Sequence, residues 1–278
     1  MIAFAGNSLF CRAALRSNSI DAASFTAIRL ATGAAVLAML VVARRSPPPS
    51  SSSLRGEGTW TSAAALAAYA VAFSFAYLRI GAAAGALILF GSVQLTMIAG
   101  GLLRGERPSP QQWLGWLVAL AGLIVINAPR LDPPSPLGAA LMVIAGIAWG
   151  IYSLRGRGIE RPLIATAGNF VRSVPAAALL IAIAFATHGH ATPKGIALAA
   201  ASGGIASGIG YSLWYAAVPA LGAHRAAVVQ LSVPVITALA AVTLLGEAMT
   251  TTLLAGAAAI VGGLALALIA PRSSGRSR

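Results

Sequence analysis

Long apolar runs separated by short polar breaks fill this chain almost from end to end. Most runs hold about 20 residues, which is the length that an α-helix needs to cross the hydrocarbon core of a bilayer. Charged residues and clusters of proline, glycine and serine mark the breaks. The pattern predicts ten transmembrane helices, over residues 1–16, 22–43, 61–79, 83–103, 111–128, 136–154, 163–187, 195–217, 226–245 and 251–270.

The pattern of apolar runs and polar breaks occurs twice along the chain, as an internal repeat. Leu103-Arg104-Gly105-Glu106 is matched by Leu244-Leu245-Gly246-Glu247, an offset of 141 positions (247 minus 106), and several glycines keep the same offset: Gly81 and Gly222, Gly115 and Gly256, Gly122 and Gly263. Each unit holds five predicted spans, an odd number, so the two units must cross the membrane in opposite senses. We therefore predict an all-α integral membrane protein of two inverted five-helix repeats, residues 1–131 and residues 132–278 with a short polar tail. Inverted repeats place two similar half-sites near the middle of the membrane, which suits alternating access.

Composition supports residence in a membrane. The chain is 58% hydrophobic and 9% charged, with a mean hydropathy of +0.84, whereas soluble domains are about 25% charged. Its net charge of +13 would suggest nucleic acid in a soluble protein. Here the basic residues lie between apolar runs and concentrate on one side of the predicted topology, so we expect no nucleic-acid partner. The positive-inside rule then predicts that both termini are cytoplasmic.

Residue types that carry catalysis or bind metal ions are nearly absent. The single cysteine, Cys11, excludes an internal disulfide, and the sequence shows no zinc-type Cys/His spacing, P-loop, HExxH or nucleophile elbow. The three histidines, His188, His190 and His224, fall in predicted loops. We predict neither an enzyme nor a metal or cofactor site.

The repeat ends and a few local motifs resemble the EamA family of the drug/metabolite transporter superfamily. The matching pieces are the paired Gly-Glu ends, Trp149-Gly150, Phe25 to Arg29, and Leu231-Ser232-Val233-Pro234. The resemblance implies a ten-helix secondary transporter whose cavity is lined by helices one to four and six to nine, with helices five and ten peripheral. Several members of this family export amino acids or other small metabolites. Gly6-Asn7 and Val93-Gln94 depart from the family pattern.

Two arginines lie inside predicted spans at near-equivalent places, Arg29 and Arg172. An arginine at the middle of a bilayer costs about 2.5–3.5 kcal/mol on insertion scales. In one interpretation both line the cavity and bind a substrate carboxylate, with Arg172 the more deeply buried. In the other they extend towards the membrane surface or cap backbone carbonyls. All six acidic residues fall in predicted loops or helix ends, so no intramembrane carboxylate is available for proton coupling.

Uncharged polar and aromatic residues complete the candidate substrate site. Asn7, Gln94 and Asn169 would hydrogen-bond a polar solute, although such side chains also stabilise helix packing by about 0.6 kcal/mol each. The aromatic candidates are Trp149, Tyr152 and Tyr211. Glu106 and Glu247 have a structural interpretation, as carboxylates that complement a helix N-terminus. The glycine pairs Gly115/Gly122 and Gly256/Gly263 predict close helix packing.

The function that these observations favour is a secondary transporter of the inner membrane. It would export a small, amino-acid-like metabolite by alternating access, as a monomer or homodimer whose partners are its substrate and the lipid bilayer. One alternative is an exchanger of anionic metabolites that uses Arg29 and Arg172. The other is a membrane protein that transports nothing.

Overall fold

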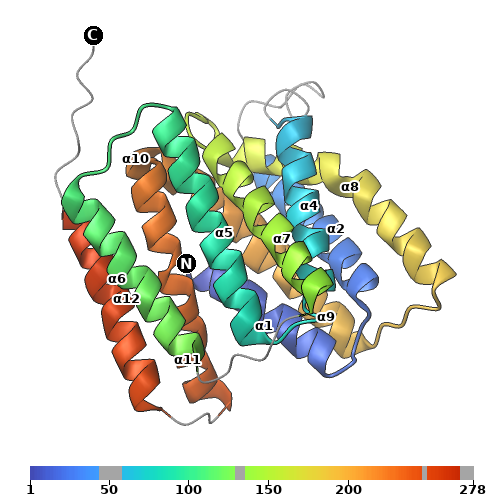
Figure 1. Ribbon diagram of the computed structural model, residues 1–278. Coiled ribbons are helices and arrows are strands. Elements are labelled where there is room, and N and C mark those ends of the chain that lie inside the picture. The colour runs from blue at the N-terminus through green and yellow to red at the C-terminus, as the bar shows by residue number, and fades with distance from the viewer. Residues whose placement is uncertain (44–57, 129–134, 246–248, 270–278) are drawn as a thin grey trace.

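The computed structural model describes residues 1–43, 58–128, 135–245 and 249–269, and these residues form a helical bundle without strands (Figure 1). Residues 129–134 around the predicted repeat boundary, Glu247 and the C-terminal tail lie outside the described residues. The helices are α1 (Ile2–Arg16), α2 (Ala22–Ala43), α4 (Trp60–Ala76), α5 (Ala82–Leu103), α6 (Pro110–Asn127), α7 (Pro136–Arg155), α8 (Pro162–Ala186), α9 (Pro193–Ala201), the π-helix η2 (Ser202–Ile209), α10 (Gly210–Gln230), α11 (Ser232–Leu245) and α12 (Thr251–Ile269).

Length and composition make six stretches of the described chain suitable for crossing a membrane. They are Ala22–Ala43, Ala83–Leu103, Pro136–Arg155, Pro162–Ala186, Pro193–Gln230 and Thr251–Ile269, and Trp60–Ala76 is a shorter apolar helix. The prediction of an all-α chain is thus confirmed for the described residues. The helices begin close to where the sequence predicts them, within about two residues for most.

Side-chain caps explain where several helices begin. The hydroxyl of an N-cap residue accepts a hydrogen bond from the backbone N–H three positions on at Thr59, Ser109, Ser135 and Thr192. Proline follows the cap directly at Pro110, Pro136 and Pro193, where a missing N–H costs nothing. The polar breaks of the sequence are therefore helix-start signals as well as loops.

The predicted loop between the eighth and ninth spans is wrong in its extent. The sequence suggests a loop between residues 217 and 226, but the structure is helical from Pro193 to Gln230 except at Gly222, whose φ is 73° and ψ 168°. Because this backbone conformation is essentially confined to glycine, one residue breaks the helix where several were expected. His224, predicted to lie in the loop, is consequently helical and 4% exposed.

Helices α6 and α12 lie side by side at one edge of the bundle (Figure 1). Their glycines face each other: a Cβ on Gly115 would lie 2.6 Å from the carbonyl oxygen of Gly263, and one on Gly122 would lie 2.6 Å from that of Gly256. Only residues without a side chain allow backbones to approach this closely. The interpretation of these glycines as a packing surface is confirmed.

Candidate functional site

Arg29 is buried between α2, α4, η2 and α10 and is 1% exposed. From α2 its Nε donates to Ser207 Oγ at 2.9 Å and its Nη2 donates to Tyr211 Oη at 2.6 Å. The guanidinium carbon sits 5.2 Å from the centre of the Tyr69 ring and 5.8 Å from that of Phe73, within cation–π range. The remaining nitrogen, Nη1, is buried and has no hydrogen-bond partner among the described residues.

Among the described residues, this buried cation has no carboxylate beside it. The described residues hold three acids, Asp21, Glu106 and Glu160, and none of them pairs with Arg29. A buried charge without a counter-charge costs several kcal/mol, and neutral hydroxyls and aromatic rings recover part of that cost. The arrangement leaves one guanidinium nitrogen suited to bind an anionic group.

Asn7 on α1 connects to the same cluster. Its Nδ2 donates to the hydroxyls of Tyr69 and Tyr211, at 3.3 Å each, and its Oδ1 accepts a hydrogen bond from Ser202 Oγ. Tyr211 is therefore shared between Asn7 and Arg29, so side chains from α1, α2, α4, η2 and α10 form one connected polar network.

Trp149 on α7 closes another side of the cluster. Its Nε1 donates to Gln230 Oε1 at 2.5 Å, and its ring lies 4.5 Å from that of Tyr211 and 5.2 Å from that of Phe4. Gln230 and Phe4 are not among the residues proposed from the sequence. Gln230 carries the same signal as Gln94, an amide inside an apolar run, but lies near the start of its predicted span. Phe4 carries no signal that separates it from other apolar residues.

A small cavity of about 20 Å³ lies within this cluster, lined by residues of α1, α4, α5, α7, α10 and α11, including Asn7, Ser8, Trp149, Tyr211 and Gln230. That volume leaves room for about one water molecule. Both halves of the chain contribute to the lining. α6 and α12 contribute none of it, and neither do α2 and α8, which the family resemblance had implied would line the cavity. This geometry is a closed polar site with aromatic walls, too small for a solute much larger than one water molecule.

The structure does not bring all the proposed residues to this cavity. Arg29 is not among the residues that line it, although its guanidinium contacts Tyr69 and Tyr211, which are. Tyr152 is fully buried and its ring packs 5.5 Å from that of Trp149, behind the lining. Gln94 is also buried, but its Nε2 donates to the carbonyl of Ala227 at 2.6 Å and its Oε1 has no partner among the described residues. Both lie beside the cavity without lining it.

Asn169 and Arg172 on α8 also fall outside the cavity lining. Asn169 is buried and its Oδ1 accepts a hydrogen bond from the backbone N–H of Thr59, at the start of α4. Arg172 is only half-buried; its Nη1 donates to Gly168 of its own helix at 3.0 Å, and its guanidinium carbon lies 6.0 Å from the Trp60 ring. The expectation that Arg172 is the more deeply buried arginine is wrong, because α8 turns this side chain towards the α4 terminus.

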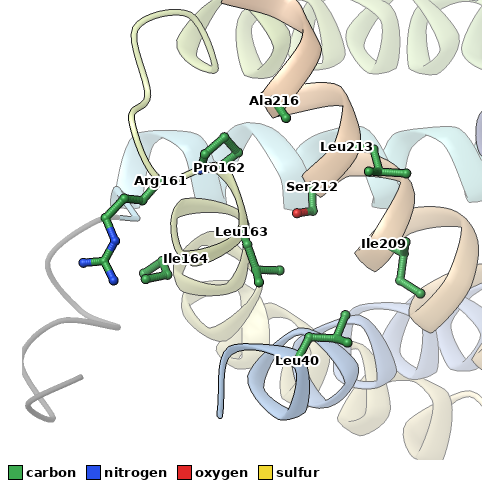
Figure 2. A pocket seen from close by; sticks show the side chains of 9 residues that line it. All are labelled: Leu40, Arg161, Pro162, Leu163, Ile164, Ile209, Ser212, Leu213 and Ala216. Atoms are coloured by element: carbon green, nitrogen blue, oxygen red, sulfur yellow. The ribbon is translucent and has the colours of Figure 1, made fainter. Parts of the chain in front are cut away.

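A larger, open groove of about 340 Å³ lies elsewhere, between the end of α2, the start of α8 and α10. Figure 2 shows its lining of mainly apolar side chains, with the Arg161 guanidinium directed away from it. Leu213 is 65% exposed, as expected for a residue that faces lipid. The groove holds no cluster of polar groups comparable to that around Arg29.

Comparison with known proteins connects this fold to transport. The profile of the EamA-like transporter family matches residues 1–128 and 136–269. An uncharacterized protein of Pseudomonas aeruginosa is 50% identical over 272 residues, which cover 98% of this chain and 92% of that protein. A solved structure of 24% sequence identity has a TM-score of 0.79 and covers 98% of this chain and 97% of its own, which shows a shared fold.

Two more distant relatives carry functional names. A Salmonella typhimurium protein named "Probable amino-acid metabolite efflux pump" is 26% identical over 209 residues, 69% of this chain and 70% of that protein. The Escherichia coli protein named "Uncharacterized inner membrane transporter YedA" is 28% identical over 139 residues, 50% of this chain and 43% of that protein. With the family profile covering both halves, this chain belongs to the EamA-like transporter family.

Proposed function

We propose that this protein is a secondary transporter of the inner membrane that exports a small, amino-acid-like metabolite by alternating access. The observation that carries the proposal is the closed polar cavity beside Arg29, inside the fold of a transporter family. The names of the Salmonella typhimurium and Escherichia coli relatives support the substrate class and the membrane.

The chemistry of the cavity matches a carboxylate with a modest side chain. Arg29 Nη1 would bind the carboxylate, since it is the buried donor without a partner among the described residues. Asn7 and Gln230 offer amide groups for the polar part of the solute, and Trp149 and Tyr211 offer aromatic surface. Because the cavity of about 20 Å³ holds only about one water, substrate entry requires the helices around it to separate.

Contacts between loops support the proposed inverted topology. At one end, Asp21 donates its backbone N–H to His190, and Thr192 donates to Ser19, which joins the α1–α2 and α8–α9 loops. Elsewhere, Glu106 contacts Arg157 and Ala223. Ten alternating spans put the first pair of loops on one face of the membrane and the second set on the other, and each set of contacts requires only that its own loops share a face.

Efflux from proteoliposomes tests the proposal. Vesicles that contain the protein and a panel of radiolabelled amino acids are expected to lose at least one solute faster than protein-free vesicles. Equal rates for every solute would contradict an amino-acid exporter.

The buried Arg29, which has no carboxylate partner in the part of the chain that the structure describes, also favours a second candidate, an exchanger of anionic metabolites. In the same vesicles an exchanger would release its solute only when an anion is supplied outside. Efflux into buffer without that anion would support the exporter, and strict dependence on it would support the exchanger.

Topology is tested with single cysteines in a Cys11→Ala background. Lys194 and Glu160 are both exposed and are predicted on the outer and inner faces. A membrane-impermeant maleimide is expected to label Lys194→Cys in intact cells and Glu160→Cys only after permeabilisation. The opposite pattern would reverse the proposed orientation.

A further inference from the structure

Glu106 joins three segments at one end of the bundle. It forms an ion pair with Arg157, and both of its carboxylate oxygens accept from the backbone N–H of Ala223, at 3.2 and 3.1 Å. The segments are the α5–α6 loop, the α7–α8 loop and the break in α10 at Gly222. We propose that these contacts, here named the Glu106 latch, close this end of the central cavity and must open in each transport cycle. The inference rests on the alternating-access function proposed above.

The latch crosses the boundary between the two halves of the chain. Glu106 belongs to residues 1–131, whereas Arg157 and Ala223 belong to residues 132–278. In transporters built from repeats, alternating access moves one set of helices against the other around a central site. A contact that ties the halves together at one end has to break when that end opens.

One glycine, Gly222, makes this contact geometrically specific. Gly222, with its φ of 73°, ends one helical stretch and leaves Ala223 as the first residue of the next, with an N–H that has no partner inside the helix. A carboxylate placed there is stabilised by the hydrogen bond and by the positive end of the helix dipole. The sequence suggested that Glu106 complements the start of its own following helix; the structure gives it the helix start at Ala223 instead.

Close packing surrounds the latch. Gly101, in the last turn of α5, has no room for a side chain, because a Cβ there would lie 2.8 Å from the Ala223 Cβ and 3.0 Å from Glu106 Oε2. The end of α5 therefore touches α10 directly at this point. Breaking the latch would free two helices that both line the central cavity.

The latch is accessible enough to open. The Arg157 and Glu106 side chains are 22% and 26% exposed, and Glu106 lines a cavity of about 510 Å³ together with Arg107, Gln112 and Gly222. Partly hydrated ion pairs contribute modestly to stability, unlike dry ones. Water can therefore replace the partners of Glu106 without a prohibitive barrier, which a cyclic gate requires.

The residue types of the latch recur at the repeat offset of 141 positions. Arg157 corresponds to Arg16, and Gly222-Ala223 corresponds to Gly81-Ala82. Glu106 corresponds to Glu247, which lies outside the described residues, so the proposal concerns Glu106 alone. The recurrence supports a feature of the repeat unit rather than an accident of one loop.

The test measures access to the cavity with a cysteine reporter and needs no substrate. Ser8 lines the cavity, and Ser8→Cys in a Cys11→Ala background is labelled with an impermeant maleimide in sealed vesicles of each orientation. Glu106→Gln keeps the shape of the side chain but removes the ion pair. It is expected to speed labelling from the Glu106 face about tenfold. Loss of one charge-assisted hydrogen bond shifts the equilibrium between closed and open forms by about this factor.

Glu160→Gln is the matched control, since Glu160 is an exposed acid in the nearby α7–α8 loop and its side chain forms no ion pair among the described residues. It is expected to leave the labelling rate unchanged. Equal rates in Glu106→Gln and the parent, or an equal rise in both glutamine variants, would overturn the latch. If Glu106→Gln is not monodisperse on size exclusion, Arg157→Gln removes the same ion pair and is judged by the same criterion.

The outcome also separates the latch from the transport proposal. Faster labelling in a protein that releases no solute would support the latch and contradict the proposed substrate. Normal efflux by the parent together with unchanged labelling in both latch variants would support the transporter and overturn the latch.

Discussion

Replacing Arg29 by glutamine is expected to lower the initial rate of efflux by about 100-fold without unfolding the protein. Truncating one partner of a buried charge pair costs about 2–5 kcal/mol in binding, and 1.36 kcal/mol is a factor of ten. The protein itself should keep or gain thermal stability, because the substitution removes a 1% exposed cation that has no carboxylate partner among the described residues. Efflux and thermal unfolding in detergent are measured on the same preparation.

Arg172→Gln is the control for this prediction. Arg172 is half-buried and hydrogen-bonds a carbonyl of its own helix, whereas Arg29 contacts Tyr69 and Tyr211 of the cavity lining. Its replacement is expected to change efflux by no more than about twofold, which corresponds to the ±0.5 kcal/mol typical of substitutions away from a site. Equal losses in both variants would contradict a special role for Arg29. Loss of stability in Arg29→Gln would favour the structural interpretation of that arginine.

The sequence could predict the helices because their signals are local. Apolar runs of span length, serine or threonine caps and prolines after them are all visible without tertiary contacts, and helix starts such as those after Ser109 and Ser135 follow directly. The extent of the break at Gly222 was not predictable in the same way. Pro219 and Gly222 signal a loop, but only the backbone angles show that a single residue suffices.

The composition of the candidate site was predictable only in part. A charge inside an apolar run identifies Arg29 and Arg172 equally, and the run does not show which neighbouring helix each arginine will face. Burial of Arg29 depends on Ser207 and Tyr211, which are 178 and 182 positions away. Gln230 was missed for a related reason: its partner Trp149 is 81 positions away.

Gly122→Ala is expected to destabilise the protein, whereas Gly262→Ala is expected to stabilise it slightly. Both glycines are helical, so both substitutions gain about the same helix propensity, up to about 1 kcal/mol. They differ in what the new methyl group meets. At Gly122 it would lie 2.6 Å from the Gly256 carbonyl oxygen and 2.8 Å from the Ile260 nitrogen, and at Gly262 nothing lies within 4 Å.

Overpacking of this kind costs about 1–3 kcal/mol, so the apparent melting temperature in detergent should fall for Gly122→Ala and hold or rise for Gly262→Ala. Equal melting temperatures would show that α6 and α12 separate easily and are not held by backbone contact. Efflux per folded molecule should be unchanged in both variants, because neither helix contributes a residue to the central cavity. A loss of efflux in folded Gly122→Ala would instead mean that the α6–α12 pair takes part in the motion that opens the cavity.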